Sequence, residues 1–328
     1  MEPILLITIV VSFFCTFFVI PFWIKKAEQI GLVWKDMNKS GGIDVAGSGG
    51  IIVLLGTVVG ILLYVALKTF YFKTDVITTS IFAMLSVLFI SLLVGLIDDF
   101  LGWRKGGLRK RHRIILILFS AIPLMVINAG ESTMMGIEFG LLYPLFFIPL
   151  GIVGATTTYN FLAGYNGLEA SQGIIILSAL AFVTYVTGNT WLSLIALYMV
   201  ASLFAFYIFN KYPAKIFPGD TLTYPVGSMI AMIAIIGNIE KIAVFFFIPY
   251  IIETGLKLRG GLNKESFAKV NNDGSLEKPY DKIYGLEHLA IDLLKKYKKD
   301  KKVHEKEVVY LINWFQIVVI LLGLLILL

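Results

Sequence analysis

The chain consists of long apolar runs that are separated by short polar segments. The first run, residues 3–24, contains no charged residue. A helix of about 20 apolar residues is long enough to cross the ~30 Å hydrocarbon core of a membrane. Because other long runs follow and no small-residue cleavage site ends the first, we interpret it as a retained membrane helix and not as a signal peptide.

Ten apolar segments have the length and composition expected of membrane helices. They are 3–24, 49–67, 75–97, 114–129, 139–159, 172–187, 191–208, 221–237, 241–258 and 307–328. In lipid, every backbone N–H and C=O group must be satisfied within the protein, and a helix satisfies them within one segment. We therefore predict an all-α, polytopic integral membrane protein with about ten transmembrane helices in a single domain, residues 1–328.

The basic residues between these segments lie mainly on one side of the predicted bundle. That side holds the loops 25–48, 98–113, 160–171, 209–220 and 257–306, whereas the other side has only Lys68, Lys73 and Lys241. Cytoplasmic loops carry an excess of lysine and arginine. We therefore predict that the first side is cytoplasmic, that both termini are external, and that the working site lies at the cytoplasmic membrane surface.

The last polar segment, about 259–306, is the one substantial extramembrane insertion that we expect. Within it, residues 267–270 and 275–280 flank Asn271-Asn272-Asp273-Gly274, which predicts a β-hairpin. Apolar residues at helical spacing and a lysine-rich end predict an amphipathic helix over 286–302. We interpret that helix as lying on the membrane against anionic head groups.

Composition agrees with this pattern and excludes several classes of function. Of 328 residues, 58% are hydrophobic and 15% are charged, with a mean hydropathy of +0.84. The single cysteine, Cys15, excludes a disulfide framework and a thiolate metal cluster. The net charge of +6 is explained by membrane topology, so we predict contacts with membrane lipids and no binding of nucleic acid.

Acidic residues stand at the polar ends of two predicted helices. Asp98 and Asp99 end the third apolar segment, and Asp220 directly precedes the eighth. Carboxylates near hydrocarbon are costly and adjacent ones repel, so they favour a bound cation. The candidates are a Mg²⁺ site or an acid–base pair; a solvated helix end and an N-cap are the alternatives. Because adjacent helical residues point about 100° apart, we expect unequal roles and favour Asp98 as the more critical.

Two further cytoplasmic loops could contact a ligand. The segment 160–169 has no lysine or arginine, and its Gly164 would let a flat ring approach the backbone closely. Its Asn166-Gly167 pair also suits a tight turn, so a purely structural loop remains the alternative. The basic residues within 104–113 could capture phosphate or serve only as a topology anchor.

Taken together and in this order, these stretches resemble the polyprenyl-phosphate N-acetylhexosamine-1-phosphate transferase superfamily. The greatest likeness is to its eukaryotic and archaeal branch, UDP-GlcNAc–dolichyl-phosphate GlcNAc-phosphotransferase. The matching stretches are 35–39, 95–113, 160–169 and 217–221, and the ten-helix layout extends the resemblance over nearly the whole chain.

The resemblance implies a role for each matching polar position. Asp98 and Asp99 would be catalytic, beside the metal and the acceptor phosphate. The metal, Mg²⁺ with Mn²⁺ as an alternative, would be held by Asn160 and Asp220. The substrate-binding residues would be Gly164 and Phe217, which sandwich the uracil, Asn166 at the edge of that ring, Arg113 at a phosphate, and Lys39.

The implied reaction transfers N-acetylglucosamine 1-phosphate, or a related sugar phosphate, from a UDP-sugar to dolichyl or polyprenyl phosphate and releases UMP. It would be the first membrane step of glycan assembly, with N-glycans favoured over cell-wall or surface polysaccharides. An ion-coupled transporter is the alternative from another class, but the acidic residues lie at helix ends and not near the midplane where transporters place them. Homodimer formation stays open.

The chain departs from the eukaryotic enzymes at two places. It has Ala46-Gly47-Ser48 where they have Pro-Glu-Ser, and residues near 264–269 replace their arginine-rich, sugar-contacting segment. The His-rich motif of the bacterial peptidoglycan and enterobacterial-type branches is also missing, which argues against a muramyl-peptide substrate. The identity of the sugar therefore stays open.

Overall fold

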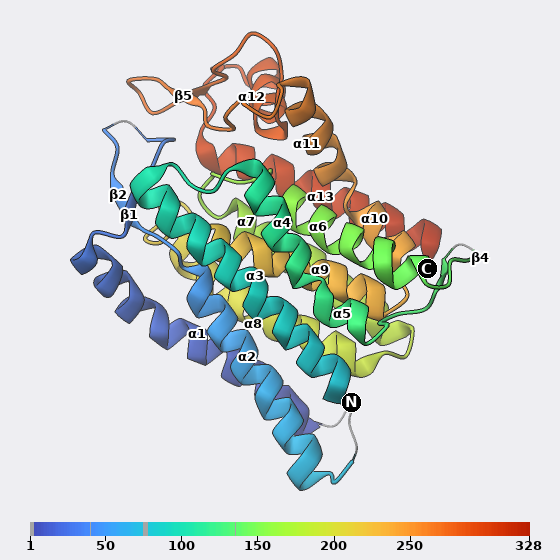
Figure 1. Ribbon diagram of the computed structural model, residues 1–328. Helices are drawn as coiled ribbons and strands as arrows, with labels where there is room; N and C mark the ends of the chain where they lie inside the picture. The colour runs from blue at the N-terminus through green and yellow to red at the C-terminus, as the bar shows by residue number, and fades with distance from the viewer. Residues whose placement is uncertain (1–2, 40, 75–77, 135) are drawn as a thin grey trace.

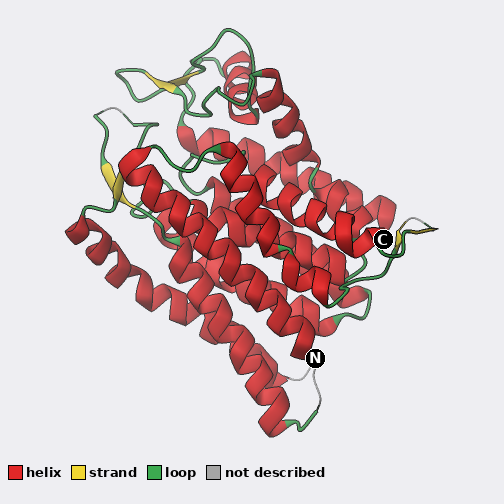
Figure 2. Cartoon of the chain, in the orientation of Figure 1, coloured by secondary structure: helices red, strands yellow, loops and turns green. Residues whose placement is uncertain are grey.

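The computed structural model describes residues 3–39, 41–74, 78–134 and 136–328. Most of these residues are helical, and long helices run side by side through the molecule (Figure 1; Figure 2). The α-helices are α1 (Pro3–Ile30), α2 (Gly50–Ala66), α3 (Thr78–Lys105), α4 (Lys110–Ser120), α5 (Ile122–Val126), α6 (Ile148–Tyr159), α7 (Leu168–Val186), α8 (Thr190–Asn210), α9 (Asp220–Ile236), α10 (Glu240–Phe246), α11 (Ile248–Arg259), α12 (Leu286–Tyr297) and α13 (Glu305–Leu327). Two π-helical turns, η1 (Leu67–Tyr71) and η2 (Tyr143–Phe147), precede α3 and α6.

Six of the described helices are long and apolar enough to cross a membrane, which supports a polytopic membrane protein. They are α1, the continuous helix Gly50–Tyr71, α3, α7, α8 and α13. The prediction of about ten spans is not confirmed: the segments expected at 114–129 and 241–258 are each divided into two helices, 139–159 changes from the π-helical turn η2 to α6, and α9 has only 17 residues.

Proline accounts for these divisions. Pro123, Pro149 and Pro249 are each the second residue of the helical piece that follows the division, in α5, α6 and α11. Proline has no N–H to donate, and its ring clashes with the carbonyl four residues earlier, so it is tolerated in the first turn of a helix but interrupts a longer one.

The helix α9 lies at the centre of the bundle and is buried along nearly its whole length. It packs against α3 and α6, and Ser228 in α9 shares hydrogen bonds with Ser91 of α3 and Thr156 of α6. The absence of a side chain at Gly95 allows α3 to approach the start of α9, since a Cβ there would lie 2.4 Å from the carbonyl oxygen of Asp220. The ends of α3 and α9 that carry the aspartates therefore lie together.

The short strands form three antiparallel hairpins within the described residues. The pairs are β1 (Val33–Lys35) with β2 (Asp44–Ala46), β3 (Thr133–Met134) with β4 (Ile137–Glu138), and β5 (Lys269–Val270) with β6 (Leu276–Glu277). The hairpin expected around residues 271–274 is confirmed as β5–β6. The fold is mostly helical, and β1–β2 and β3–β4 are two short hairpins that the sequence did not predict.

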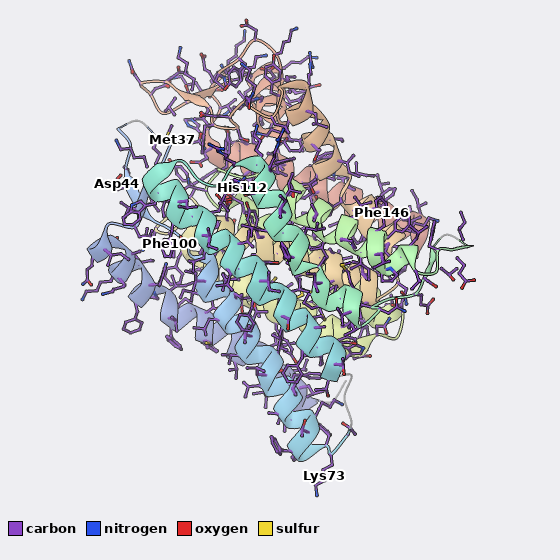
Figure 3. All side chains as sticks on the ribbon, viewed as in Figure 1. Met37, Asp44, Lys73, Phe100, His112 and Phe146 are labelled. Atoms are coloured by element: carbon purple, nitrogen blue, oxygen red, sulfur yellow. The ribbon has the colours of Figure 1, made fainter. Side chains whose placement is uncertain are left out.

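The polar segments gather at one end of the bundle. The β1–β2 and β5–β6 hairpins and α12 lie there, while both termini and β4 lie toward the opposite end (Figure 1). Met37 and Asp44 mark the first end and Lys73 the other (Figure 3). This arrangement matches the division of the loops into two sides that the basic residues predicted.

The helix expected over 286–302 is shorter and has different neighbours. It ends at Tyr297, and Leu286, Ala290 and Ile291 are buried in the protein. Three lysines that were expected to meet lipid head groups form ion pairs instead: Lys295 with Glu277, Lys298 with Glu307 and Lys302 with Asp273. Part of the apolar face therefore packs against α11 and α13, whereas Leu293 and Tyr297 are exposed, and contact of this helix with a membrane stays a prediction.

Candidate active site

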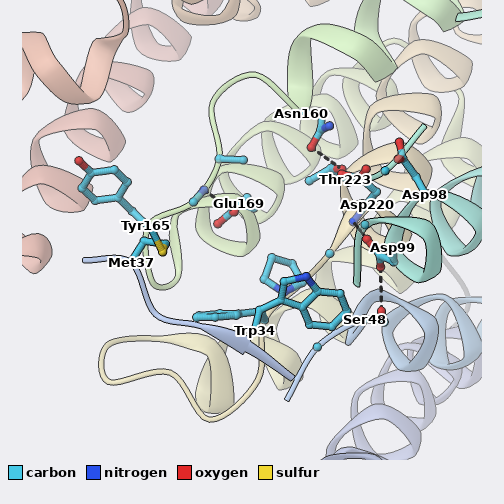
Figure 4. Close-up of a pocket in the computed structure, with 18 of the residues that line it drawn as sticks. Trp34, Met37, Ser48, Asp98, Asp99, Asn160, Tyr165, Glu169, Asp220 and Thr223 are labelled. Carbon is cyan, nitrogen blue, oxygen red and sulfur yellow. Dashed lines mark hydrogen bonds between the residues drawn. The ribbon is translucent and has the colours of Figure 1, made fainter. Parts of the chain in front are cut away.

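A cavity of about 540 Å³ opens at the polar end of the bundle (Figure 4). Segments far apart in the sequence form its walls: the β1–β2 hairpin, the end of α3, the α6–α7 loop, the residues before α9 and the last loop. Most of the expected site residues line it, namely Asp98, Asp99, Arg113, Asn160, Gly164, Phe217 and Asp220. The structure therefore brings these positions together, whereas Lys39 and Asn166 lie outside the cavity lining.

Asp99 uses both carboxylate oxygens to hold the start of α9. Its Oδ1 accepts a hydrogen bond from the backbone N–H of Asp220 at 2.7 Å, and its Oδ2 accepts one from Thr221 Oγ1 at 3.0 Å. Ser48 Oγ also donates to Oδ2, at 2.9 Å. The first N–H groups of a helix lack partners within the helix, so Asp99 acts as a cap supplied by another helix. The position of Asp220 therefore depends on Asp99.

Asp98 faces a different set of groups. Its Oδ2 lies 2.6 Å from Nε of Arg113 and accepts a hydrogen bond from Tyr224 OH at 2.9 Å. Nη2 of Arg113 lies 3.8 Å from Oδ2 of Asp220, so the guanidinium stands between two carboxylates. A guanidinium fixed in this way presents its remaining N–H groups in the planar arrangement that suits phosphate oxygens.

Gly164 is fixed by contacts on several sides. Its N–H donates to Glu169 Oε1 at 2.8 Å, and its carbonyl accepts a hydrogen bond from Asn38 Nδ2 at 3.0 Å. Its φ of +106° lies in the region that favours glycine, and a Cβ would lie 2.8 Å from Cε1 of Phe267. The aromatic ring in contact with Gly164 is therefore that of Phe267, a residue the sequence analysis did not select.

Phe217 is held on a neighbouring wall of the cavity. Its N–H donates to the carbonyl of Ala46 at 2.7 Å, and its carbonyl accepts from the N–H of Gly49 at 2.9 Å. The segment before α9 is thereby fixed alongside the end of β2. The sandwich of a uracil ring between Gly164 and Phe217 stays a prediction.

Asn166 faces the protein and not the cavity. Its Nδ2 donates to Asp36 Oδ2 at 3.1 Å and to Glu305 Oε1 at 2.8 Å, and its Oδ1 accepts from the N–H of Ala214 at 2.6 Å. Both polar atoms of the side chain thus have partners within the protein, and the expected hydrogen bond to the edge of a ligand ring stays a prediction. The structure gives Asn166 a positioning role for the 160–169 loop.

Lys39 also has partners within the protein. Its Nζ lies 2.7 Å from Oδ2 of Asp36 and 5.0 Å from the ring centroid of Tyr212. Its charge is paired outside the cavity lining, and the expected contact between Lys39 and substrate stays a prediction.

A second, more basic pocket of about 300 Å³ adjoins the first. The two share Arg113, Asn160, Ala163 and Phe267, and the second is also lined by Lys110, Lys257 and Lys264. Lys110 Nζ donates to the carbonyl of Leu262 at 2.8 Å, which ties the last loop to α4. Such a cluster of cations attracts an anionic group.

Comparison with known proteins identifies the family. Residues 81–238 match the family described as Glycosyl transferase family 4, a region that contains the aspartate pair, the 160–169 loop and Asp220. A Saccharolobus solfataricus protein provisionally named UDP-N-acetylglucosamine–dolichyl-phosphate N-acetylglucosaminephosphotransferase is 37% identical over 286 residues, 84% of this chain and 85% of the relative. The chain belongs to glycosyl transferase family 4. The family resemblance stated from the sequence is thus confirmed.

Other family 4 relatives carry two different names. A Dictyostelium discoideum protein named UDP-N-acetylglucosamine–dolichyl-phosphate N-acetylglucosaminephosphotransferase is 29% identical over 280 residues, 72% of this chain and 67% of its own length. A Halalkalibacterium halodurans protein named phospho-N-acetylmuramoyl-pentapeptide-transferase is also 29% identical, over 274 residues, 77% of this chain and 81% of its own length. Identity at this level does not select one sugar.

The oxygen atoms around Asp220 fit the Mg²⁺ on which family 4 enzymes generally depend. Asp220 and Asn160 both line the cavity, and Thr223 donates to Asn160 Oδ1 at 3.0 Å. In the described part of the chain, no group of three or more His, Cys, Asp or Glu residues could hold a metal alone. Mg²⁺ usually takes one or two carboxylates and completes its ligands with water and substrate phosphates, so this donor set suits it.

Some residues of this site could have been found from the sequence and others could not. Thr223 and Tyr224 follow Asp220 by three and four residues, so helical spacing alone places them on the same face. Glu305, which accepts hydrogen bonds from the N–H and Nδ2 of Asn166, is 139 positions away, and no local pattern indicates that contact.

The close packing at Gly164 gives a testable prediction about the family 4 donor site. Gly164→Ala is expected to weaken UMP binding, because a Cβ would occupy space against which a flat ring could pack. The double variant Gly164→Ala/Phe267→Ala removes the clash between the new Cβ and the ring of Phe267. Its UMP affinity is compared with that of the single variant Phe267→Ala. Calorimetry should show that the double variant binds UMP more weakly than Phe267→Ala does. Binding equal to that of Phe267→Ala would mean that Gly164 only accommodates Phe267.

Proposed function

We propose that the protein transfers N-acetylglucosamine 1-phosphate, or a related N-acetylhexosamine 1-phosphate, from its UDP-sugar to a dolichyl or polyprenyl phosphate. The observation that carries this proposal is the single cavity in which Asp98, Arg113, Asn160 and Asp220 meet Gly164 and Phe217. Charged and polar groups suited to a diphosphate thus share one space with an aromatic ring suited to a base. The names of the archaeal and Dictyostelium relatives support the same reaction.

The proposed chemistry is a displacement at phosphorus. An oxygen of the lipid phosphate attacks the phosphorus that bears the sugar, a new P–O bond forms, and the bond to UMP breaks as UMP leaves. The attacking oxygen is already anionic near neutral pH, so no protein group needs to remove a proton from it. The protein has mainly to position the phosphates and balance their charge.

Arg113 and the residues around it would position the phosphates and balance their charge. The Asp98 carboxylate orients the guanidinium through the 2.6 Å contact, and the guanidinium binds phosphate oxygens. Asp220 and Asn160 would hold Mg²⁺, whose chemical contribution when bound is neutralisation of negative charge on the diphosphate. Asp99 keeps Asp220 in place through the start of α9.

The basic pocket beside the cavity suits the phosphate of the lipid acceptor. Lys110 and Lys264 supply positive charge there, whereas Lys257 is paired with Glu253; Ile114, which also lines this pocket, is an exposed apolar residue of α4. A lipid phosphate in this pocket would adjoin Arg113, which belongs to both spaces. This supports an arrangement in which the donor occupies the larger cavity and the acceptor phosphate enters from the smaller one.

The proposed place of the reaction is the cytoplasmic face of the membrane, with both chain termini on the opposite side. The lysine and arginine distribution supports this orientation, and the cavity lies at the end that holds the basic loops. The product, a sugar linked through diphosphate to a lipid, would be the starting point for glycan assembly, and N-glycans are the glycans we favour.

A donor panel tests the proposal. Purified protein would be given UDP-GlcNAc, UDP-GalNAc or UDP-MurNAc-pentapeptide, each with dolichyl or undecaprenyl phosphate and Mg²⁺. We expect UMP release and a lipid-diphosphate-GlcNAc product with the first donor, identified by mass spectrometry. Transfer of the muramyl-pentapeptide alone would contradict the proposed sugar, and no UMP release from any donor would contradict the reaction.

A further inference from the structure

Trp34 is an aromatic residue of the cavity wall to which neither the sequence pattern nor the family relationship gives a role. Its indole packs so closely on Gly47 that a Cβ at Gly47 would lie 1.7 Å from Cζ3 and 2.1 Å from Cε3 of the ring. The indole therefore occupies the space that a side chain at position 47 would need. Position 47 is also where the eukaryotic enzymes of the resemblance carry a glutamate, whereas this chain has glycine there.

The surrounding backbone holds the indole in place. Trp34 lies in β1 opposite Val45 of β2, and the N–H of Gly47 donates to the carbonyl of Leu32 at 3.1 Å. The carbonyl of Gly47 accepts a hydrogen bond from Trp23 Nε1 at 3.0 Å. A ring that is already ordered loses little conformational entropy when a ligand packs against it.

The indole also has unused capacity for contact. It is half-buried and lines the cavity, so part of its surface remains open to a ligand. Among the described residues, no group accepts a hydrogen bond from Nε1 of Trp34, in contrast to Trp23. Tryptophan N–H groups usually have a hydrogen-bond partner when they are buried. Because Nε1 of Trp34 has none among the described residues, its N–H is available to donate to a bound molecule.

The position of Trp34 relates it to both ends of the cavity. In Figure 4 it lies between Met37 and Tyr165 on one side and Asp99 and Asp220 on the other. Phe217 also lies on this wall. Its backbone N–H donates a hydrogen bond to the carbonyl of Ala46, the residue directly before Gly47. If the phosphates of a bound nucleotide lie near the aspartates, its uridine would therefore lie against the indole ring of Trp34.

We propose that Trp34 is a nucleotide-contacting residue, whose indole packs against the uridine of the donor. The inference rests on the proposed function, because it takes a UDP-sugar to be the occupant of the cavity. Aromatic contact with a nucleoside contributes substantially to binding, and the indole would add a contact to those expected of Gly164 and Phe217. The absence of a side chain at Gly47 is what leaves room for the indole at this place in the cavity wall.

Tryptophan fluorescence and calorimetry with UMP test the contact without relying on catalysis. UMP is expected to change the fluorescence of the wild-type protein, and Trp34→Phe should remove most of that change while UMP still binds. Trp34→Ala should weaken UMP binding roughly tenfold or more. Trp314→Phe is the matched control, since Trp314 is an exposed residue of α13, and it should leave the fluorescence change intact.

A double-variant cycle separates the contact from a merely structural role. Gly47→Ala should displace the indole and weaken UMP binding, but it should add little in a Trp34→Ala background, where the space is free. Additive losses, or wild-type UMP affinity in folded Trp34→Ala protein, would overturn the inference. Failure of folded wild-type protein to bind UMP would instead overturn the proposed donor.

Discussion

Asp98→Asn is expected to lower turnover roughly 100-fold or more, whereas Asp99→Asn should act mainly by lowering thermal stability. Asp98 lies in the cavity wall with its Oδ2 2.6 Å from Nε of Arg113. An asparagine keeps the shape of this side chain but removes the charge that orients the guanidinium toward the phosphates. The effect should therefore appear in turnover, with little change in melting temperature.

Asp99 is expected to behave differently because its oxygens accept hydrogen bonds from Ser48, Thr221 and the N–H of Asp220. An asparagine offers one acceptor oxygen and turns an NH₂ group toward donors, so the start of α9 loses part of its cap. Ser48→Ala is the matched control, since it removes one of these hydrogen bonds and no charge, and a smaller fall in melting temperature is expected. Equal, mild losses of turnover for the two asparagine variants would contradict a catalytic role for the pair.

The elements that the sequence predicted correctly depend on local patterns. The apolar runs form helices because they are long enough to cross a membrane and because backbone N–H and C=O groups in lipid must be hydrogen-bonded within the protein. The β5–β6 hairpin follows from Asn271-Asn272-Asp273-Gly274, which forms the turn. Pro123, Pro149 and Pro249 stand where the helical pieces α5, α6 and α11 begin, so these boundaries also have a local cause.

The features that the sequence did not predict depend on contacts between distant segments. The amide of Asn166 is bonded to Asp36, Glu305 and the N–H of Ala214, so its burial follows from three segments that meet only in the fold. Trp34 is a cavity residue because Gly47 leaves room for its ring. The packing of α12 against α11 and α13 also joins segments that no local pattern in the sequence brings together.

Asp220→Ala is expected to abolish transfer, with a loss of roughly a thousandfold or more, while leaving the protein folded in detergent. Asp220 begins α9, and its carboxylate shares the cavity with Asn160 and with the carboxylates of Asp98 and Asp99. Within the described residues, Arg113 is the basic residue that lies within 4 Å of these carboxylates. The excess of negative charge favours a bound cation, and Asp220 is the carboxylate that we propose as its ligand.

The decisive measurement combines turnover with heat stability across a series of Mg²⁺ concentrations. Mg²⁺ and UMP together should raise the melting temperature of the wild-type protein, because a ligand that binds the folded state stabilises it. That rise should be lost in Asp220→Ala. Thr223→Val is the control: it removes the hydroxyl that donates to Asn160 Oδ1 but keeps both proposed ligands, so transfer and the Mg²⁺-dependent rise should persist. Activity of Asp220→Ala within a few-fold of wild type at saturating Mg²⁺ would remove Asp220 from the metal site, and the excess charge would then have to be balanced by the basic residues alone.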